Sequence, residues 1–147
     1  MGFAAIRELS VLVGTPAGQK ADLLVVPMSK DAPELPAGLA SLFTGDANPV
    51  RAALASGDFK GDAGETLVVY GASPDHARVL LLGTGPARDF SLDRVRSVGA
   101  SAARRARDLG VGRVLFILPL PGAQAWTKEE QLTAAAEGAI LGTWQFP

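Results

Sequence analysis

The sequence predicts an α/β fold in which helices cover both faces of a mixed, mostly buried β-sheet. Two observations lead to this prediction. Apolar runs such as 79–82 and 114–118 lack the polar alternation of a strand with one wet face, so both faces of these strands should be covered. Between such runs the apolar residues recur at helical spacing. Strands that alternate with amphipathic helices build a three-layer α/β/α sandwich.

The stretch 64–85 lies at the centre of the predicted sheet. It contains two apolar runs, joined by a link at 71–77 that is rich in turn-forming residues. This link is too short for a helical crossover, so the two strands should be antiparallel neighbours. A full helix separates them from the run at 114–118, and that strand can therefore run parallel to the second of them.

The chain before this stretch should add two strands and two short helices. Residues 11–13 form a short strand, for which an edge position is expected, and residues 23–26 form a second strand. Residues 39–43 and 49–55 suit short helices, and Asn48 is a candidate N-cap for the second.

Two longer helices are predicted after residue 85. The first should begin at Ser91 as N-cap and end at Gly110. The second should begin with a capping box formed by Thr127 and Glu130, and should end near Gly142. Helical spacing predicts that the buried face of the first helix consists of Leu92, Val95, Val98, Gly99, Ala102, Ala106 and Leu109. The same argument predicts that the buried face of the second helix consists of Leu132, Ala135, Ala136, Ala139 and Ile140.

Composition narrows the classes of function. The 147 residues suit one domain, and the formal net charge of −1 offers no overall field that would attract nucleic acid or an anionic membrane. The chain has no cysteine, which excludes disulfides and thiolate chemistry and fits a cytoplasmic protein. No apolar run approaches the ~20 residues that span a bilayer, and the first residues do not resemble a secretory signal.

The turn Gly83-Thr84-Gly85 lies where phosphate-binding loops occur, after a buried strand and before a helix. The dinucleotide fingerprint would place a third glycine at position 88, which is Arg88, and the P-loop sequence is absent. We therefore interpret the segment as a tight turn.

Other polar groups have structural interpretations. Asp58, Asp62 and Glu65 precede the central strands without the spacing of an EF-hand, so solvated turn residues are expected. His76, the one histidine, lies in a turn and should be exposed. Five arginines crowd the helix after Ser91 but do not form one stripe, which is typical of a solvated helix. They are Arg94, Arg96, Arg104, Arg105 and Arg107.

Trp144 and Phe146 follow the last predicted helix directly. Two large aromatic residues in this position indicate a partner surface or a continuation of the chain.

Three segments resemble a known family. Residues 56–66 (SGDFKGDAGET) resemble the loop that leads into the middle strands of the N-terminal domain of leucyl aminopeptidases, the M17 or cytosol aminopeptidase peptidases. Residues 78–85 (RVLLLGTG) are similar to that domain's "VLLVGLG" strand, and residues 137–146 (EGAILGTWQF) resemble its closing "EGALLGxYxF" helix. The resemblance covers nearly the whole chain in the same order.

The resemblance implies a macro-domain-like fold over residues 1–142, with 143–147 as the start of a connection to a C-terminal catalytic domain. In the family that domain holds two zinc or manganese ions, the catalytic lysine and arginine, and the "NTDAEGR" motif. None of these is found here, so no catalytic, cofactor-binding or metal-binding residue is assigned and this chain alone should be inactive. The implied partners are its own catalytic domain and the other subunits of a hexamer.

Three functions are therefore compared. The first is a non-catalytic module for domain packing and oligomer assembly. The second is a macro-domain-type binder of ADP-ribose, with Asp22 as the adenine-binding carboxylate, although the "NAAN" and triple-glycine segments of such domains are absent. The third is a regulatory DNA-contacting module, for which the arginine-rich helix is the only support, so nucleic acid is not favoured.

Overall fold

The computed structural model describes residues 8–13, 16–30, 35, 37–89, 91–118 and 126–143. The elements in chain order are β1 (Glu8–Val13), β2 (Ala21–Met28), α1 (Ala37–Ala40), α2 (Pro49–Ser56), β3 (Thr66–Ser73), β4 (His76–Gly83), a 3₁₀ turn (Ala87–Asp89), α3 (Leu92–Leu109), β5 (Arg113–Leu118) and α4 (Lys128–Thr143).

The strands form one five-stranded sheet with the order β1-β5-β2-β4-β3. Strands β1, β5, β2 and β4 are parallel, and β3 pairs antiparallel with β4, as the short link between them predicted. Strand β1 lies at the edge, as expected. Strands β4 and β5 point the same way, but they are not neighbours, because β2 lies between them.

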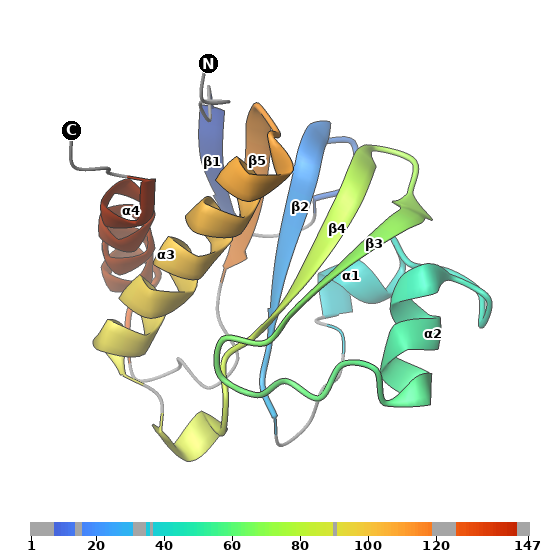
Figure 1. The fold of residues 1–147 in the computed structure, drawn as a ribbon, viewed down its shortest axis with the longest axis horizontal. Coiled ribbons are helices and arrows are strands. Elements are labelled where there is room, and N and C mark those ends of the chain that lie inside the picture. Colours follow the sequence, from blue (N-terminus) through green and yellow to red (C-terminus); the bar gives the residue numbers. More distant parts are fainter. Residues whose placement is uncertain are drawn as a thin grey trace.

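The sheet separates two layers of helices. Helices α3 and α4 cover one face, and α1 and α2 lie on the other (Figure 1). Side chains of the central strands alternate between the two cores. Leu23 and Leu80 pack under α3, whereas Leu24 and Leu81 pack on the side of α1 and α2. The predicted three-layer architecture with a mixed, mostly buried sheet is confirmed.

The helix ends follow the local signals in the sequence. The Ser91 hydroxyl caps α3 by accepting a hydrogen bond from the Arg94 N–H at 3.2 Å, and Gly110 ends that helix in a left-handed conformation. The Thr127 hydroxyl accepts from the Glu130 N–H, while the Glu130 carboxylate accepts from the Thr127 N–H, both at 3.0 Å. This is the predicted capping box of α4.

Two sequence predictions were wrong in detail. Helix α1 occupies Ala37–Ala40 rather than 39–43, and a turn follows it. In α4, Ala135 and Ala139 are buried as predicted, but Leu132 and Ile140 are exposed. Small residues occupy the inner face instead, because α4 packs closely against α3 and large side chains do not fit there. Within the described residues, no helix has both the length and the apolarity needed to cross a bilayer.

Candidate functional site

Parallel α/β sheets bind ligands beyond the carboxyl ends of their strands, where backbone N–H groups are free. At this carboxyl edge, β4 ends in the turn Gly83-Thr84-Gly85, but each of its backbone N–H groups already has an acceptor within the protein. The acceptors are the carbonyl oxygens of Glu65, Met28 and Gly61, which lie 2.8, 2.9 and 2.9 Å from the nitrogens of Gly83, Thr84 and Gly85. The turn therefore offers no free N–H group to a phosphate.

The segment that closes this edge is the loop at 58–65, here called the plug loop. It is anchored by Phe59, whose side chain is buried in the core beside α1 and α2. Glycine is required at two contacts. A Cβ on Gly61 would collide with the Ser29 carbonyl group, and a Cβ on Gly83 would collide with the carbonyl oxygen of Asp62. The plug loop thus packs backbone against backbone on the ends of β2 and β4.

The plug loop also contains an anion-binding arrangement that is already filled. The Glu65 carboxylate accepts hydrogen bonds from the N–H groups of Lys60, Gly61 and Asp62 at 2.9–3.2 Å. Successive N–H groups that converge in this way bind anions in many proteins. Here the anion is an internal carboxylate, so the half-buried Glu65 holds the turn together in addition to its contact with solvent.

The two aspartates of the predicted acidic cluster lie nearer the solvent. Asp58 is exposed, and Asp62 forms an ion pair of 2.8 Å with Lys30. The hydrogen bond and attraction from Lys30 lower the pKa of Asp62 below its usual value. The cluster does not converge on one point.

The described residues do not fit a metal centre. Within them, no three histidine, aspartate or glutamate side chains come together as potential ligands. A pair of divalent ions needs several such ligands around one cavity. No catalytic step through a metal can therefore be derived for the described part of the chain.

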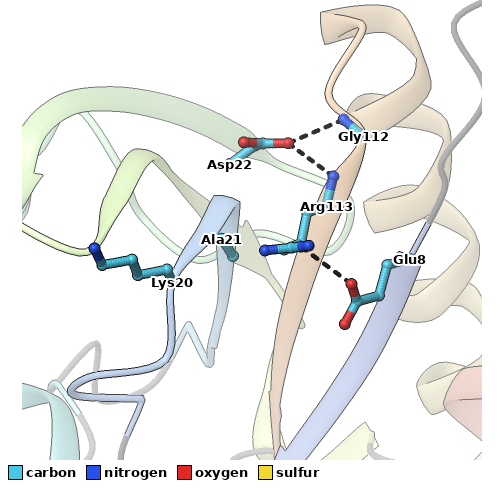
Figure 2. Close-up of a pocket in the computed structure, with 6 residues that line it drawn as sticks. All are labelled: Glu8, Lys20, Ala21, Asp22, Gly112 and Arg113. Carbon is cyan, nitrogen blue, oxygen red and sulfur yellow. Dashed lines mark hydrogen bonds and ion pairs between the residues drawn. The ribbon is translucent and has the colours of Figure 1, made fainter.

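The opposite, amino edge of the sheet has a polar cavity of about 450 Å³. Figure 2 shows the residues that line it. Several of their charged groups form hydrogen bonds or ion pairs between the ends of the strands. The Asp22 carboxylate accepts from the N–H groups of Gly112 (3.2 Å) and Arg113 (2.8 Å). The Arg113 guanidinium pairs with Glu8 at 3.0 Å, and the Lys20 amino group points away from this pair (Figure 2). These contacts tie together the starts of β1, β5 and β2.

The location of Asp22 bears on the ADP-ribose hypothesis. Its carboxylate lies at the amino edge and is engaged by main-chain N–H groups, whereas the fold binds ligands at the carboxyl edge. Asp22 therefore stabilises the start of β5, and nothing in this geometry places it against an adenine.

His76 is buried, with 1% of its surface exposed, so the prediction of an exposed turn residue was wrong. Its Nε2 lies 2.7 Å from the Gln19 carbonyl oxygen, which can only accept, so Nε2 carries the proton. Its Nδ1 then accepts from the Ser73 hydroxyl at 2.7 Å. Burial lowers the pKa of His76 below its usual value. The imidazole therefore fastens the β3–β4 turn to the segment before β2.

Arg94 and Arg96, two of the five arginines of α3, bind neighbours within the domain. The Arg94 guanidinium donates to the Thr84 carbonyl oxygen, and Arg96 pairs with Asp93 and Glu137 at 2.6 and 3.6 Å. This agrees with the interpretation of a solvated helix whose long side chains border the core. Trp144 and Phe146, and the predicted connection at 143–147, lie outside the described residues except for Thr143.

Comparison with known sequences identifies this architecture. The sequence model described as "Cytosol aminopeptidase family, N-terminal domain" matches residues 25–147. The chain belongs to the cytosol aminopeptidase family. A probable cytosol aminopeptidase of Roseiflexus castenholzii is 36% identical over 141 residues, and one of Chlorobium luteolum is 36% identical over 153 residues. These matches cover 95% and 98% of this chain, but the chain spans only 26% of each relative.

Solved structures show the same fold for this cytosol aminopeptidase N-terminal domain. A mutant of tomato leucine aminopeptidase superposes with a TM-score of 0.66 at 20% identity, covering 94% of this chain and 28% of that chain. The bottromycin maturation enzyme BotP superposes with a TM-score of 0.55 at 22% identity, covering 86% of this chain and 24% of that chain. At these identities the similarity concerns the fold.

Proposed function

We propose that this chain is the non-catalytic N-terminal domain of an M17 leucyl aminopeptidase and serves domain packing and oligomer assembly. In the proposed parent enzyme, a C-terminal domain would hold two zinc or manganese ions and remove N-terminal amino acids from peptides in the cytoplasm. Family membership and the share of each relative that the chain spans support this division of labour. The absence of cysteine fits the cytoplasmic assignment.

The observation that carries the proposal is that the ends of β2 and β4, the part of the carboxyl edge that the structure describes, are covered. A ligand-binding or catalytic α/β domain keeps donors free at the ends of its parallel strands. Here carbonyl groups of the plug loop accept from the N–H groups of Gly83 and Gly85, the Met28 carbonyl group at the end of β2 accepts from that of Thr84, and Glu65 fills the neighbouring anion site.

A hydrolysis assay tests the catalytic part of the proposal. Purified chain is incubated with Mn²⁺ or Zn²⁺ and leucine p-nitroanilide, with the Roseiflexus relative as positive control. The chain should release nitroaniline no faster than buffer containing the same metal. Metal-dependent release that scales with the concentration of the chain would contradict the proposal.

A titration tests the ADP-ribose alternative. Because the turn after β4 has no free N–H group, calorimetry should detect no binding of ADP-ribose to the purified chain. Binding in the micromolar range would require the plug loop to leave its position. That result would make the domain a ligand-binding module instead.

A further inference from the structure

Large apolar side chains are exposed at few positions in the described part of the chain, and most of them lie on one helix. Tyr70 on β3 is 59% exposed. The others are on α4, where Leu132, Ile140 and Leu141 are 41%, 68% and 69% exposed. A concentration of exposed aliphatic side chains on a single element is typical of a surface that another protein surface covers.

The inner face of α4 cannot rotate to bury these side chains. Gly138 and Gly142 lie directly against the backbone of α3, and a Cβ on either would collide with the carbonyl oxygen of Arg96 or Ala100. Ala135 packs in the same contact, next to Gly99. Because the two helices interlock through small residues, α4 holds its other side toward the solvent in a fixed orientation.

The exposed residues form a defined surface, here called the outer α4 patch, made of Leu132, Ala136, Ile140 and Leu141. The first three follow the i, i+4, i+8 spacing of one helical stripe, and Leu141 lies on the adjacent stripe, one turn after Glu137. Ala136 is half-buried within the stripe. The exposed carboxylates of Glu129 and Glu137 lie beside the patch, and Glu137 also pairs with Arg96, so the rim carries a partly compensated acidic charge. A complementary surface would be apolar with a basic rim.

We propose that the outer α4 patch docks the C-terminal domain of the parent enzyme, through an apolar surface bordered by lysine or arginine. This inference rests on the proposed function. Three large side chains expose far less than the ~800 Å² per partner of a stable interface between separate proteins. A tethered domain needs less contact, because the covalent connection supplies a millimolar effective concentration. The size of the patch therefore favours a domain of the same polypeptide over a second copy of this chain.

Because the chain has no cysteine, a single introduced thiol can report on the patch. Thr133 is exposed on α4 beside the patch, and Ala77 is exposed at the start of β4. Thr133→Cys is prepared in the chain and in a full-length chimera that carries this chain in place of the matching quarter of the Roseiflexus relative. Thiol labelling is followed at that peptide by mass spectrometry. Ala77→Cys serves as the control site.

The thiol at position 133 should react about tenfold more slowly in the chimera than in the isolated chain, and the thiol at position 77 should react equally in both. Adding Ile140→Asp and Leu141→Asp to the chimera should restore fast labelling at 133, while Tyr70→Asp should not. Since Ile140 and Leu141 are exposed, the isolated chain that carries both aspartates should remain folded and should show a cooperative thermal transition.

The outcomes separate the two proposals. An assembled chimera in which position 133 stays reactive overturns the docking inference and leaves the proposed function intact. Protection of position 133 that persists with both aspartates in place also overturns it, since another surface would then be responsible. A chimera that neither assembles nor hydrolyses leucine p-nitroanilide contradicts the proposed function itself. Protection in the isolated chain that grows with protein concentration would identify a second copy of the chain as the occupant of the patch. That result would overturn the inference that the C-terminal domain docks there.

Discussion

The two edges of the sheet differ in how they use their polar groups. At the carboxyl edge, the plug loop covers the ends of β2 and β4, and the N–H groups of the turn at 83–85 all have internal acceptors. At the amino edge, a cavity of about 450 Å³ remains. Its charged lining residues form partly exposed interactions, such as the ion pair between Glu8 and Arg113. Among the described residues, the ends of β2 and β4, where this type of fold binds ligands, are therefore covered.

This difference shows that an α/β topology alone does not provide a binding site. The strand directions place β2, β4 and β5 as ligand-binding sheets do, but the donors that a phosphate would need at 83–85 are bound to carbonyl groups of the plug loop and of Met28. The open edge has room, but among its described lining residues the Asp22 carboxylate already serves the main chain of β5. We therefore expect substitutions in the plug-loop contact to lower the free energy of unfolding by more than substitutions at the amino edge.

The largest effect is expected at the contact between β4 and the plug loop. Gly83→Ala would drive a Cβ into the carbonyl oxygen of Asp62, and backbone cannot yield as a flexible side chain does. We expect a loss of about 3 kcal/mol in the free energy of unfolding, measured by urea denaturation. Gly64→Ala is the matched control, since it has a positive φ but open space, and should cost about 1 kcal/mol. Equal costs would show that the close contact is absent.

The second effect concerns the internal anion. Glu65→Gln removes the charge that three backbone N–H groups share, and should destabilise the chain by about 1.5 kcal/mol. Asp58→Asn in the same loop changes an exposed carboxylate and should stay within about 0.5 kcal/mol. If both variants unfold at the same urea concentration as the parent chain, the hydrogen bonds of Glu65 contribute nothing and the plug loop is not held as described.

The third effect is the pH dependence of stability. Burial lowers the pKa of His76, so the unfolded chain takes up a proton first as the pH falls below about 6.5. Stability should therefore be greatest above that pH and should decline toward the lowered pKa, by at most about 1.4 kcal/mol per pH unit. His76→Gln should flatten the curve between pH 7.5 and 5.5, because the chain has no other histidine. An unchanged slope would mean that His76 is not buried as a neutral group.

The smallest effect is expected at the amino edge. Glu8→Gln breaks an ion pair in which both side chains are more than half exposed, and should change the free energy of unfolding by less than about 0.5 kcal/mol. The difference should vanish in 1 M salt, because ions screen exposed pairs. A loss above 1 kcal/mol that survives salt would remove the contrast between the two edges.

The sequence predicted the features that depend on neighbours along the chain. Ser91, Gly110 and the Thr127–Glu130 box were identifiable because a cap is formed by residues within a few positions. The solid apolar strands likewise predicted a sheet covered on both faces. Features made by distant segments were missed. The buried His76 binds the Gln19 carbonyl group, which is 57 residues away in the chain. No local sequence pattern predicts this contact.

The face of α4 illustrates the same limit. Helical spacing placed Leu132 and Ile140 inward, since hydrophobicity alone decides such an assignment. In the structure, close packing against α3 selects Gly138 and Gly142 for the inner side, and the large residues lie outside. A sequence shows which side chains prefer burial, but not which surface will come near enough to bury them.

Hydrogen exchange of the backbone amides at 83–85 tests the closed carboxyl edge most directly. The account predicts that Gly83, Thr84 and Gly85 exchange as slowly as the amides of buried β2, and that saturating ADP-ribose leaves their rates unchanged. Rapid exchange at these amides in the otherwise folded chain, or slowing on addition of ADP-ribose, would show that the donors are free and would contradict the account.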